Sequence, residues 1–255
     1  MGKIKYTLWL LLMMVFCSPS SGATFSDESL HYVISYKWGL IYKDAGDATL
    51  SLRNHGNEYM IKLTGKTKPW ADNFYQVRDT LLGRVKKDGL RPVAYTKIAH
   101  EKGKYSRDDI SYSHAGKVVG GAAKRIRQQK DGSLKVTEKQ LTGSGDVYDM
   151  LSVFYFIRQI DYSKLQKGEE VSATVFSGSK VETITIRCVG TETIKLRDKS
   201  KREVYHIKFK FTTAGKKKSS DDIDTWISTD SSHIPLLVVG SLPVGQVKCY
   251  YVGGK

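Results

Sequence analysis

The segment that decides the fold runs from Asp146 to Ile160 and reads DVYDMLSVFYFIRQI. Its apolar side chains recur at helical spacing, which predicts a helix over this range. Asp146 or Asp149 can cap the start of this helix. Apolar residues also occupy a second side of this helix, so its apolar surface is too wide for a helix exposed to water. We therefore expect the helix to pack across the concave face of a strongly curved sheet.

Segments with alternating apolar and polar residues flank the helix on both sides. In the N-terminal half they occupy 32–37, 48–52, 58–64, 93–98, 109–114, 117–119 and 122–127. The same pattern covers most of 170–252, and turn residues separate the segments, as in antiparallel sheets with one buried face. The sequence therefore predicts an all-β, mainly antiparallel fold with one amphipathic helix on the concave face. A second, shorter helical turn is expected at 69–74, where Pro69 suits a first helical position.

The first 23 residues have the features of an export signal. Lys3 and Lys5 precede an uncharged apolar run, and small residues follow at 21–23. The apolar core is shorter than the roughly 20 residues that a membrane-spanning helix needs. We expect cleavage after Ala23, which leaves residues 24–255 as a single exported β domain. A lipoprotein attached through Cys17 is the weaker alternative, because the bulky Phe16 precedes this cysteine.

The chain carries a formal net charge of +15, and loss of Lys3 and Lys5 with the signal leaves +13. An exported basic protein meets lipid headgroups, lipopolysaccharide phosphates and acidic glycans rather than nucleic acid, and no nucleic-acid-binding motif accompanies the charge. The plainest interpretation is a solvated basic surface. An envelope polyanion is the alternative partner.

Two cysteines, Cys188 and Cys249, remain after residue 23. In each segment the cysteine shares a face with apolar neighbours, so both are expected to point inward. Export permits a disulfide, but we favour two unpaired core thiols. Neither cysteine has a second metal ligand nearby in the sequence.

A succession of short segments resembles a known family, although no single motif is specific. The segments are Tyr32–Tyr36 with Gly39 and Ala45–Gly46, Tyr75–Asp79, Gly89–Pro92, Asp149–Ser152 through Tyr155 to Arg158, Gly168, and Trp226–Asp230 with Pro235. In this order they resemble the exported bacterial family called domain of unknown function 3108. The resemblance implies a half-open barrel or β-roll with a helix against its interior, located in the periplasm of Gram-negative bacteria. It implies no established activity.

The charged residues Arg78, Asp79 and Arg158 form the most informative combination. An arginine on an apolar helix flank needs a partner if it is buried, and Asp79 or Asp149 can supply a carboxylate. Either a buried ion pair holds the helix to the sheet, or Arg158 or Arg78 receives an anionic headgroup at the mouth of a cavity. In the second case aromatic side chains would line an apolar ligand pocket. These are Trp70, Phe74, Tyr75, Tyr155 and Trp226.

No catalytic or metal-binding constellation is recognisable in the sequence. The six histidines are spread singly, without metal-ligand spacing. The acidic run 221–224 lacks the glycine and the distal glutamate of a calcium loop, which favours a charged turn. We therefore predict no cofactor and no metal.

The sequence is compatible with three functional hypotheses. The leading one is a non-enzymatic periplasmic binding or carrier protein for a lipid or another anionic amphiphile. The second is an envelope interaction protein that binds acidic glycan or a membrane-protein partner through its basic surface. A hydrolase with an unrecognised site is the third.

Overall fold

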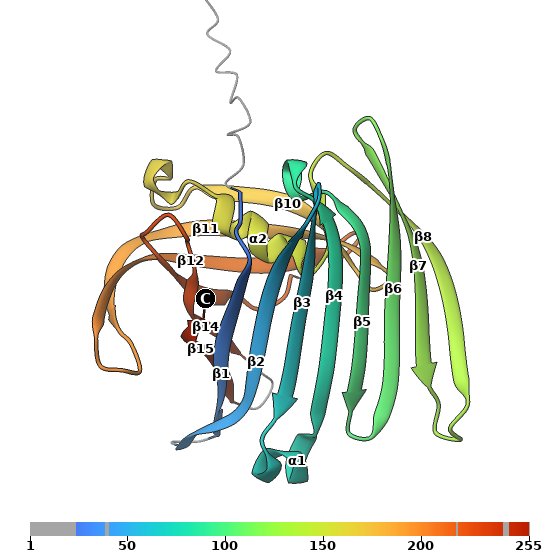
Figure 1. Cartoon of the computed structure of the whole chain (residues 1–255), viewed down its shortest axis with the longest axis horizontal. Helices are drawn as coiled ribbons and strands as arrows, with labels where there is room; N and C mark the ends of the chain where they lie inside the picture. Colours follow the sequence, from blue (N-terminus) through green and yellow to red (C-terminus); the bar gives the residue numbers. More distant parts are fainter. Residues whose placement is uncertain (1–23, 39–40, 218, 242–244, 255) are drawn as a thin grey trace, which may run out of the picture.

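All fifteen strands of the described residues belong to one sheet (Figure 1). The computed structural model describes residues 24–254, except 39–40, 218 and 242–244. The strand order is β8-β7-β6-β5-β4-β3-β2-β1-β15-β14-β13-β12-β11-β10-β9. Every pairing in the sheet is antiparallel except that of β9 with β10. The predicted all-β, mainly antiparallel class is thereby confirmed.

Two α-helices and two short 3-10 turns interrupt the strands. In chain order the elements are β1 (Glu28–Trp38), β2 (Ile41–His55), β3 (Glu58–Thr67), α1 (Pro69–Tyr75), β4 (Val77–Lys86), η1 (Asp88–Leu90), β5 (Pro92–Glu101), β6 (Lys104–Ala115), β7 (Val118–Gln128), β8 (Leu134–Ser144), β9 (Val147–Tyr148), α2 (Ser152–Gln159), η2 (Tyr162–Lys164), β10 (Glu170–Ser177), β11 (Lys180–Lys195), β12 (Lys201–Thr213), β13 (Ile223–Ser228), β14 (Pro235–Ser241) and β15 (Gln246–Gly254).

The sheet curls into a nearly closed barrel, rather than the half-open barrel that the family resemblance implied. The end of the β10–β11 hairpin closes the seam against β7 and β8. Phe176 packs where Gly121 and Gly143 leave room: an added Cβ would lie 2.7 Å and 3.1 Å, respectively, from its ring. Arg125 Nη1 also donates a hydrogen bond to Ser179 Oγ at 3.0 Å. Closure of the barrel therefore depends on Gly121 and Gly143, which the alternation of apolar and polar residues in the sequence does not reveal.

The predicted helix is present on the concave face, but it is shorter than 146–160. α2 begins only at Ser152, and Val147–Tyr148 form the short strand β9 instead. Asp149 separates the two elements: its Oδ1 accepts the backbone N–H groups of Leu151 at 2.7 Å and Ser152 at 2.8 Å. Leu151, Val153 and Tyr155 join the buried core of the sheet.

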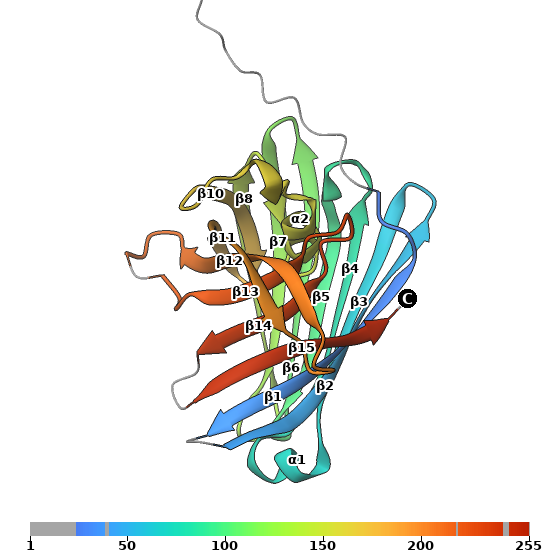
Figure 2. The ribbon, with the colours of Figure 1, turned by 90° about the vertical axis from the view of Figure 1, so that its left-hand side faces the viewer.

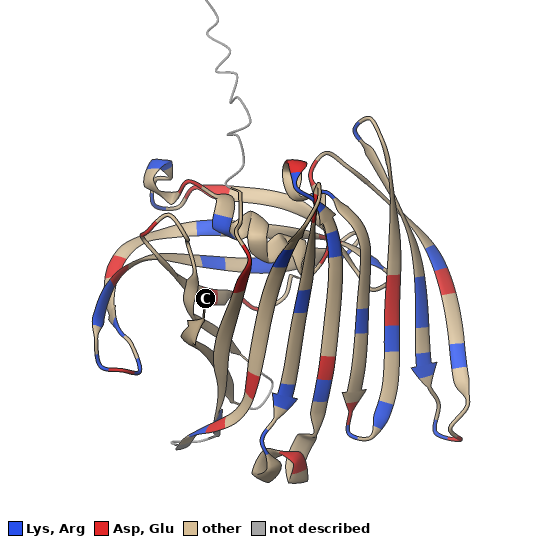
Figure 3. Cartoon of the chain, viewed as in Figure 1, with Lys and Arg blue, Asp and Glu red and all other residues tan. Residues whose placement is uncertain are grey.

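The inward face of β5–β8 changes character along the barrel axis. In the part next to α2, which we call the upper wall, the inward residues Tyr95, Ile110 and Ala123 are apolar and buried, and so is Leu141 one row higher on β8; Lys139, opposite Ala123, is exposed. One register row further from α2, Lys97 lies opposite Asp108, and Asp108 lies opposite Arg125. These three and Asp79, Glu101, Arg127 and Thr137 form the lower wall. Charged bands cross β6–β8 in Figure 3, whereas most of α2 is tan.

The two helices lie at opposite ends of the barrel, as Figures 1 and 2 both show. α1 covers Pro69–Tyr75, so the helical turn predicted at 69–74 is confirmed. Neither helix of the described part of the chain has the length and apolar character needed to cross a membrane. The predicted signal peptide, with Cys17, falls outside the described residues.

Cys188 and Cys249 are unpaired, as the sequence favoured. Cys188 is buried, and Cys249 lies opposite Ile34 on β1. Burial raises the pKa of the Cys249 thiol to about 11, so this thiol stays protonated at neutral pH.

Candidate ligand-binding site

A hollow of about 800 Å³ lies between the tip of the β11–β12 hairpin, the β13–β14 turn and the end of β15. In Figure 1 this hairpin bends around the left side of the barrel, close to the C-terminus. The volume lies within the range of roughly 300–1,000 Å³ that is typical of small-molecule pockets. We call this hollow the hairpin pocket.

The lining of the hairpin pocket combines apolar and charged side chains. The apolar ones are Leu196, Ile234, Leu236, Tyr251 and Val252, and the charged ones are Arg197, Asp198, Lys201, Arg202, Glu203 and Asp230. Asp198 is engaged by Ser200, and Asp230 accepts hydrogen bonds from Ser232 and Ser228. Within the described part of the chain, the side chains of Lys201, Arg202 and Glu203 make no hydrogen bond or ion pair. With Arg197 paired to Asp44, the other charged side chains of the lining are two cations and three carboxylates, and their charges sum to −1.

Arg197 fastens the tip of the hairpin to β2. Its guanidinium donates to both carboxylate oxygens of Asp44 on β2, at 2.9 Å and 2.8 Å. It also lies 5.1 Å from the ring centroid of Tyr250. Hydrogen bonds from Arg197 hold the pKa of Asp44 at about 2, well below its usual value. The hairpin tip is thus tied by a charge-assisted, bidentate contact.

Arg158 lies next to the pocket, because its Nε donates to the carbonyl oxygen of Ser232 at 3.0 Å. Its side chain is only 2% exposed and forms a bidentate ion pair with Glu28 on β1. The rings of Phe25 and Tyr155 cover the guanidinium at 4.9 Å and 5.2 Å. The buried pair joins α2 to the sheet, but its carboxylate comes from Glu28, not from Asp79 or Asp149 as the sequence suggested.

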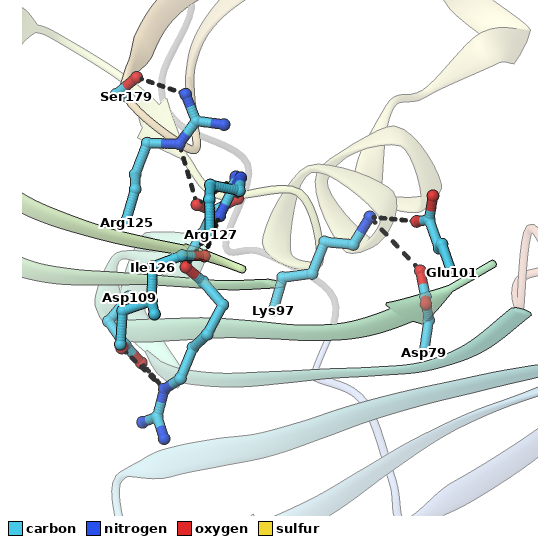
Figure 4. A network of polar contacts seen from close by, with 10 residues as sticks. Asp79, Lys97, Glu101, Asp109, Arg125, Ile126, Arg127 and Ser179 are labelled. Atoms are coloured by element: carbon cyan, nitrogen blue, oxygen red, sulfur yellow. Dashed lines mark hydrogen bonds and ion pairs between the residues drawn. The ribbon is translucent and has the colours of Figure 1, made fainter. Parts of the chain in front are cut away.

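The lower wall carries a separate polar network, shown in Figure 4. Lys97 Nζ lies 3.4 Å from Asp79 Oδ2 and 3.5 Å from Glu101 Oε1. Desolvation raises the pKa of Asp79 above its usual value, although Lys97 opposes this shift. Further along, Arg125 Nε and Arg127 Nη2 both contact the carboxylate of Asp108, at 3.0 Å and 2.6 Å. Charged groups thus face the barrel interior here while remaining partly exposed.

The eight residues proposed for a ligand site do not lie in one place. Trp70, Phe74, Tyr75 and Arg78 lie at the α1 end, where Arg78 pairs with Asp72 at 2.7 Å. Asp79 belongs to the lower wall, and Tyr155 and Arg158 lie on α2. Trp226 stacks on His206 on the face opposite the buried Thr225 and Ile227. None of the eight lines the hairpin pocket.

The hairpin pocket was missed because it joins the polar tip 196–203 with the ends of β13, β14 and β15, which lie apart in the sequence. The only sequence signal was the segment 226–230, quoted for the family resemblance, of which Ser228, Thr229 and Asp230 line the pocket. Across the described ranges, no group of three or more His, Cys, Asp or Glu side chains is placed to hold a metal ion.

Comparisons with known proteins place this geometry in a family without assigning an activity. The chain is similar to a solved structure from Brucella abortus, a β-barrel-like protein of domain of unknown function DUF1849. The two share 13% sequence identity with a TM-score of 0.61, and the similarity covers 91% of this chain and 98% of the other. No curated protein matches. A family model described as protein of unknown function (DUF3108) matches residues 31–251, and the chain belongs to this family.

Proposed function

We propose that this protein is an exported, periplasmic binding or carrier protein for an anionic amphiphile such as a lipid. The hairpin pocket carries this proposal, because its volume suits a small ligand and its lining combines apolar and charged side chains. A ligand with both an apolar and a charged part can contact both kinds of side chain, whereas a purely polar ligand leaves the apolar side chains in contact with water.

Two adjacent cations at the hairpin tip are the groups of the pocket that can receive an anionic headgroup. Arg197 is committed to Asp44, and Asp198 and Asp230 are engaged by serines. Lys201 and Arg202 remain to receive a phosphate or carboxylate, with the carboxylate of Glu203 as their neighbour in the lining. The apolar part of the ligand would lie against Ile234, Leu236 and Tyr251.

The predicted export signal supports the same proposal, since a protein outside the cytoplasm meets membrane lipids. The barrel shared with the DUF1849 structure supports only the fold, because one fold serves many functions.

Mass spectrometry of the protein purified from the periplasm of a Gram-negative host tests the proposal. The native spectrum should show an added mass that disappears on denaturation and is identified as a lipid. Leu236→Trp, which fills the pocket, should lose this mass. Leu237→Trp is the matched control, since the neighbouring side chain does not line the pocket. A bare native mass, or the same added mass in both variants, would contradict the proposal.

A further inference from the structure

The strand β8 has one free edge. It is the first strand of the sheet and pairs only with β7. Near α2 its end is covered, because Gly143 lies against Phe176. Residues 134–140, in contrast, are exposed on both faces, and no strand of the described chain covers their edge. Every second residue of this stretch therefore directs its backbone N–H and C=O groups to the free edge, where they are available for pairing.

The two faces of this exposed stretch differ in how their charges are matched. On the outward face, Lys124 of β7 lies opposite Glu138, and Ile126 lies opposite Val136. These are favourable cross-strand pairs. On the inward face, Arg127 lies opposite Lys135, so that two cations face each other. Like charges in directly opposed positions destabilise a sheet.

β8 itself supplies no inward carboxylate that could pair with these cations. Lys135 and Lys139 make no ion pair with any described residue, and Asp108 is the carboxylate that contacts both Arg125 and Arg127. The outward face of the same stretch exposes Leu134 by 55% and Val136 by 50%. The free edge thus carries cations on its inward face and, at Leu134 and Val136, apolar side chains on its outward face.

We propose that the free edge of β8 binds an extended polypeptide segment in which acidic and apolar residues alternate. Such a segment would add as a further strand beside residues 134–140. Side chains of a strand alternate between faces, so its carboxylates would meet Lys135 and Lys139 while its apolar residues lie beside Leu134 and Val136. A second copy of this basic edge fits less well, because its own lysines would add further positive charge.

This inference is independent of the proposed ligand. The free edge shares no residue with the hairpin pocket, so either proposal can fail alone.

Fluorescence anisotropy with two labelled, blocked peptides tests the inference. One peptide alternates glutamate and valine over seven residues, and the other has the same composition arranged in two blocks. Only the alternating peptide can place all carboxylates on one face, so it should bind about tenfold more tightly. On its binding, hydrogen exchange of the alternate amides of 134–140 that point to the free edge should slow, because these groups become paired.

Protein variants separate strand addition from general attraction to acids. Lys135→Glu with Lys139→Glu should weaken binding of the alternating peptide about tenfold. Lys117→Glu with Lys130→Glu makes the same change in net charge in the turns that flank β7 and should leave binding within about twofold. Thermal unfolding of both double variants shows that they are folded. Equal binding of the two peptides, no binding, or self-association through β8 would overturn the inference.

Discussion

The upper and lower walls of the barrel are made by the same strands but have opposite environments. On β5, Tyr95 and Lys97 point to the same face and are only two residues apart. Tyr95 is 3% exposed beneath α2, whereas the Lys97 side chain is 35% exposed. The difference follows from what covers each wall: α2 fills the space next to the upper wall, and no described helix lies against the lower one. Stability should therefore depend on the upper wall.

The largest effect is expected at the closure of the upper wall. Phe176 is fully buried against Gly121 and Gly143, so Phe176→Ala should lower the free energy of unfolding by about 3–5 kcal/mol. Denaturant titration measures this loss. A loss below about 1 kcal/mol would mean that the seam does not hold the upper wall together.

The buried carboxyl of Asp149 should make the upper wall sensitive to pH. Burial raises its pKa in the folded state from 3.8 to about 6, so folding becomes less favourable as pH rises through this interval. Asp149→Asn removes the ionisation while keeping an oxygen that accepts the two N–H groups. The free energy of unfolding of the variant, relative to that of the wild type, should therefore rise by about 3 kcal/mol from pH 4 to pH 7. If the difference in the free energy of unfolding between variant and wild type did not change with pH, the raised pKa of Asp149 would be contradicted.

The smallest effect is expected in the lower wall. Lys97→Met removes the cation between Asp79 and Glu101, but the partly exposed pair is screened by solvent. The free energy of unfolding should change by no more than about 1 kcal/mol. A loss comparable to that of Phe176→Ala would show that the lower wall contributes as much to stability as the upper wall.

The difference between the upper and lower walls also explains which strands could be recognised from the sequence. Most strands with a buried inward face were recognised by alternation. β4 and β8 were not, because Asp79 and Gly83 interrupt the inward series of β4, and Lys135, Thr137 and Lys139 replace apolar residues in β8. A strand that faces water on both sides loses the period of two on which its recognition depends.

The sequence predicted the chemistry of a few functional side chains better than their positions. The expectation that Arg158 has a buried partner was confirmed, but Glu28 lies 130 residues away in the chain and follows from no local pattern. The aromatic residues grouped as one pocket were dispersed because the alternation of faces and the direction of each strand separate them. Closure of the barrel and the hairpin pocket both arise from contacts between distant turns.

A pair of substitutions on β8 tests the difference between the walls most directly. Leu141 and Thr137 lie on the same inward face, four residues apart, but Leu141 is 3% exposed in the upper wall and Thr137 is exposed opposite Arg125. Leu141→Asp should lower the free energy of unfolding by more than about 3 kcal/mol, because it buries a charge without a partner. Thr137→Asp should change it by less than about 1 kcal/mol. Equal losses in denaturant titrations of the two variants would contradict the division of the barrel interior.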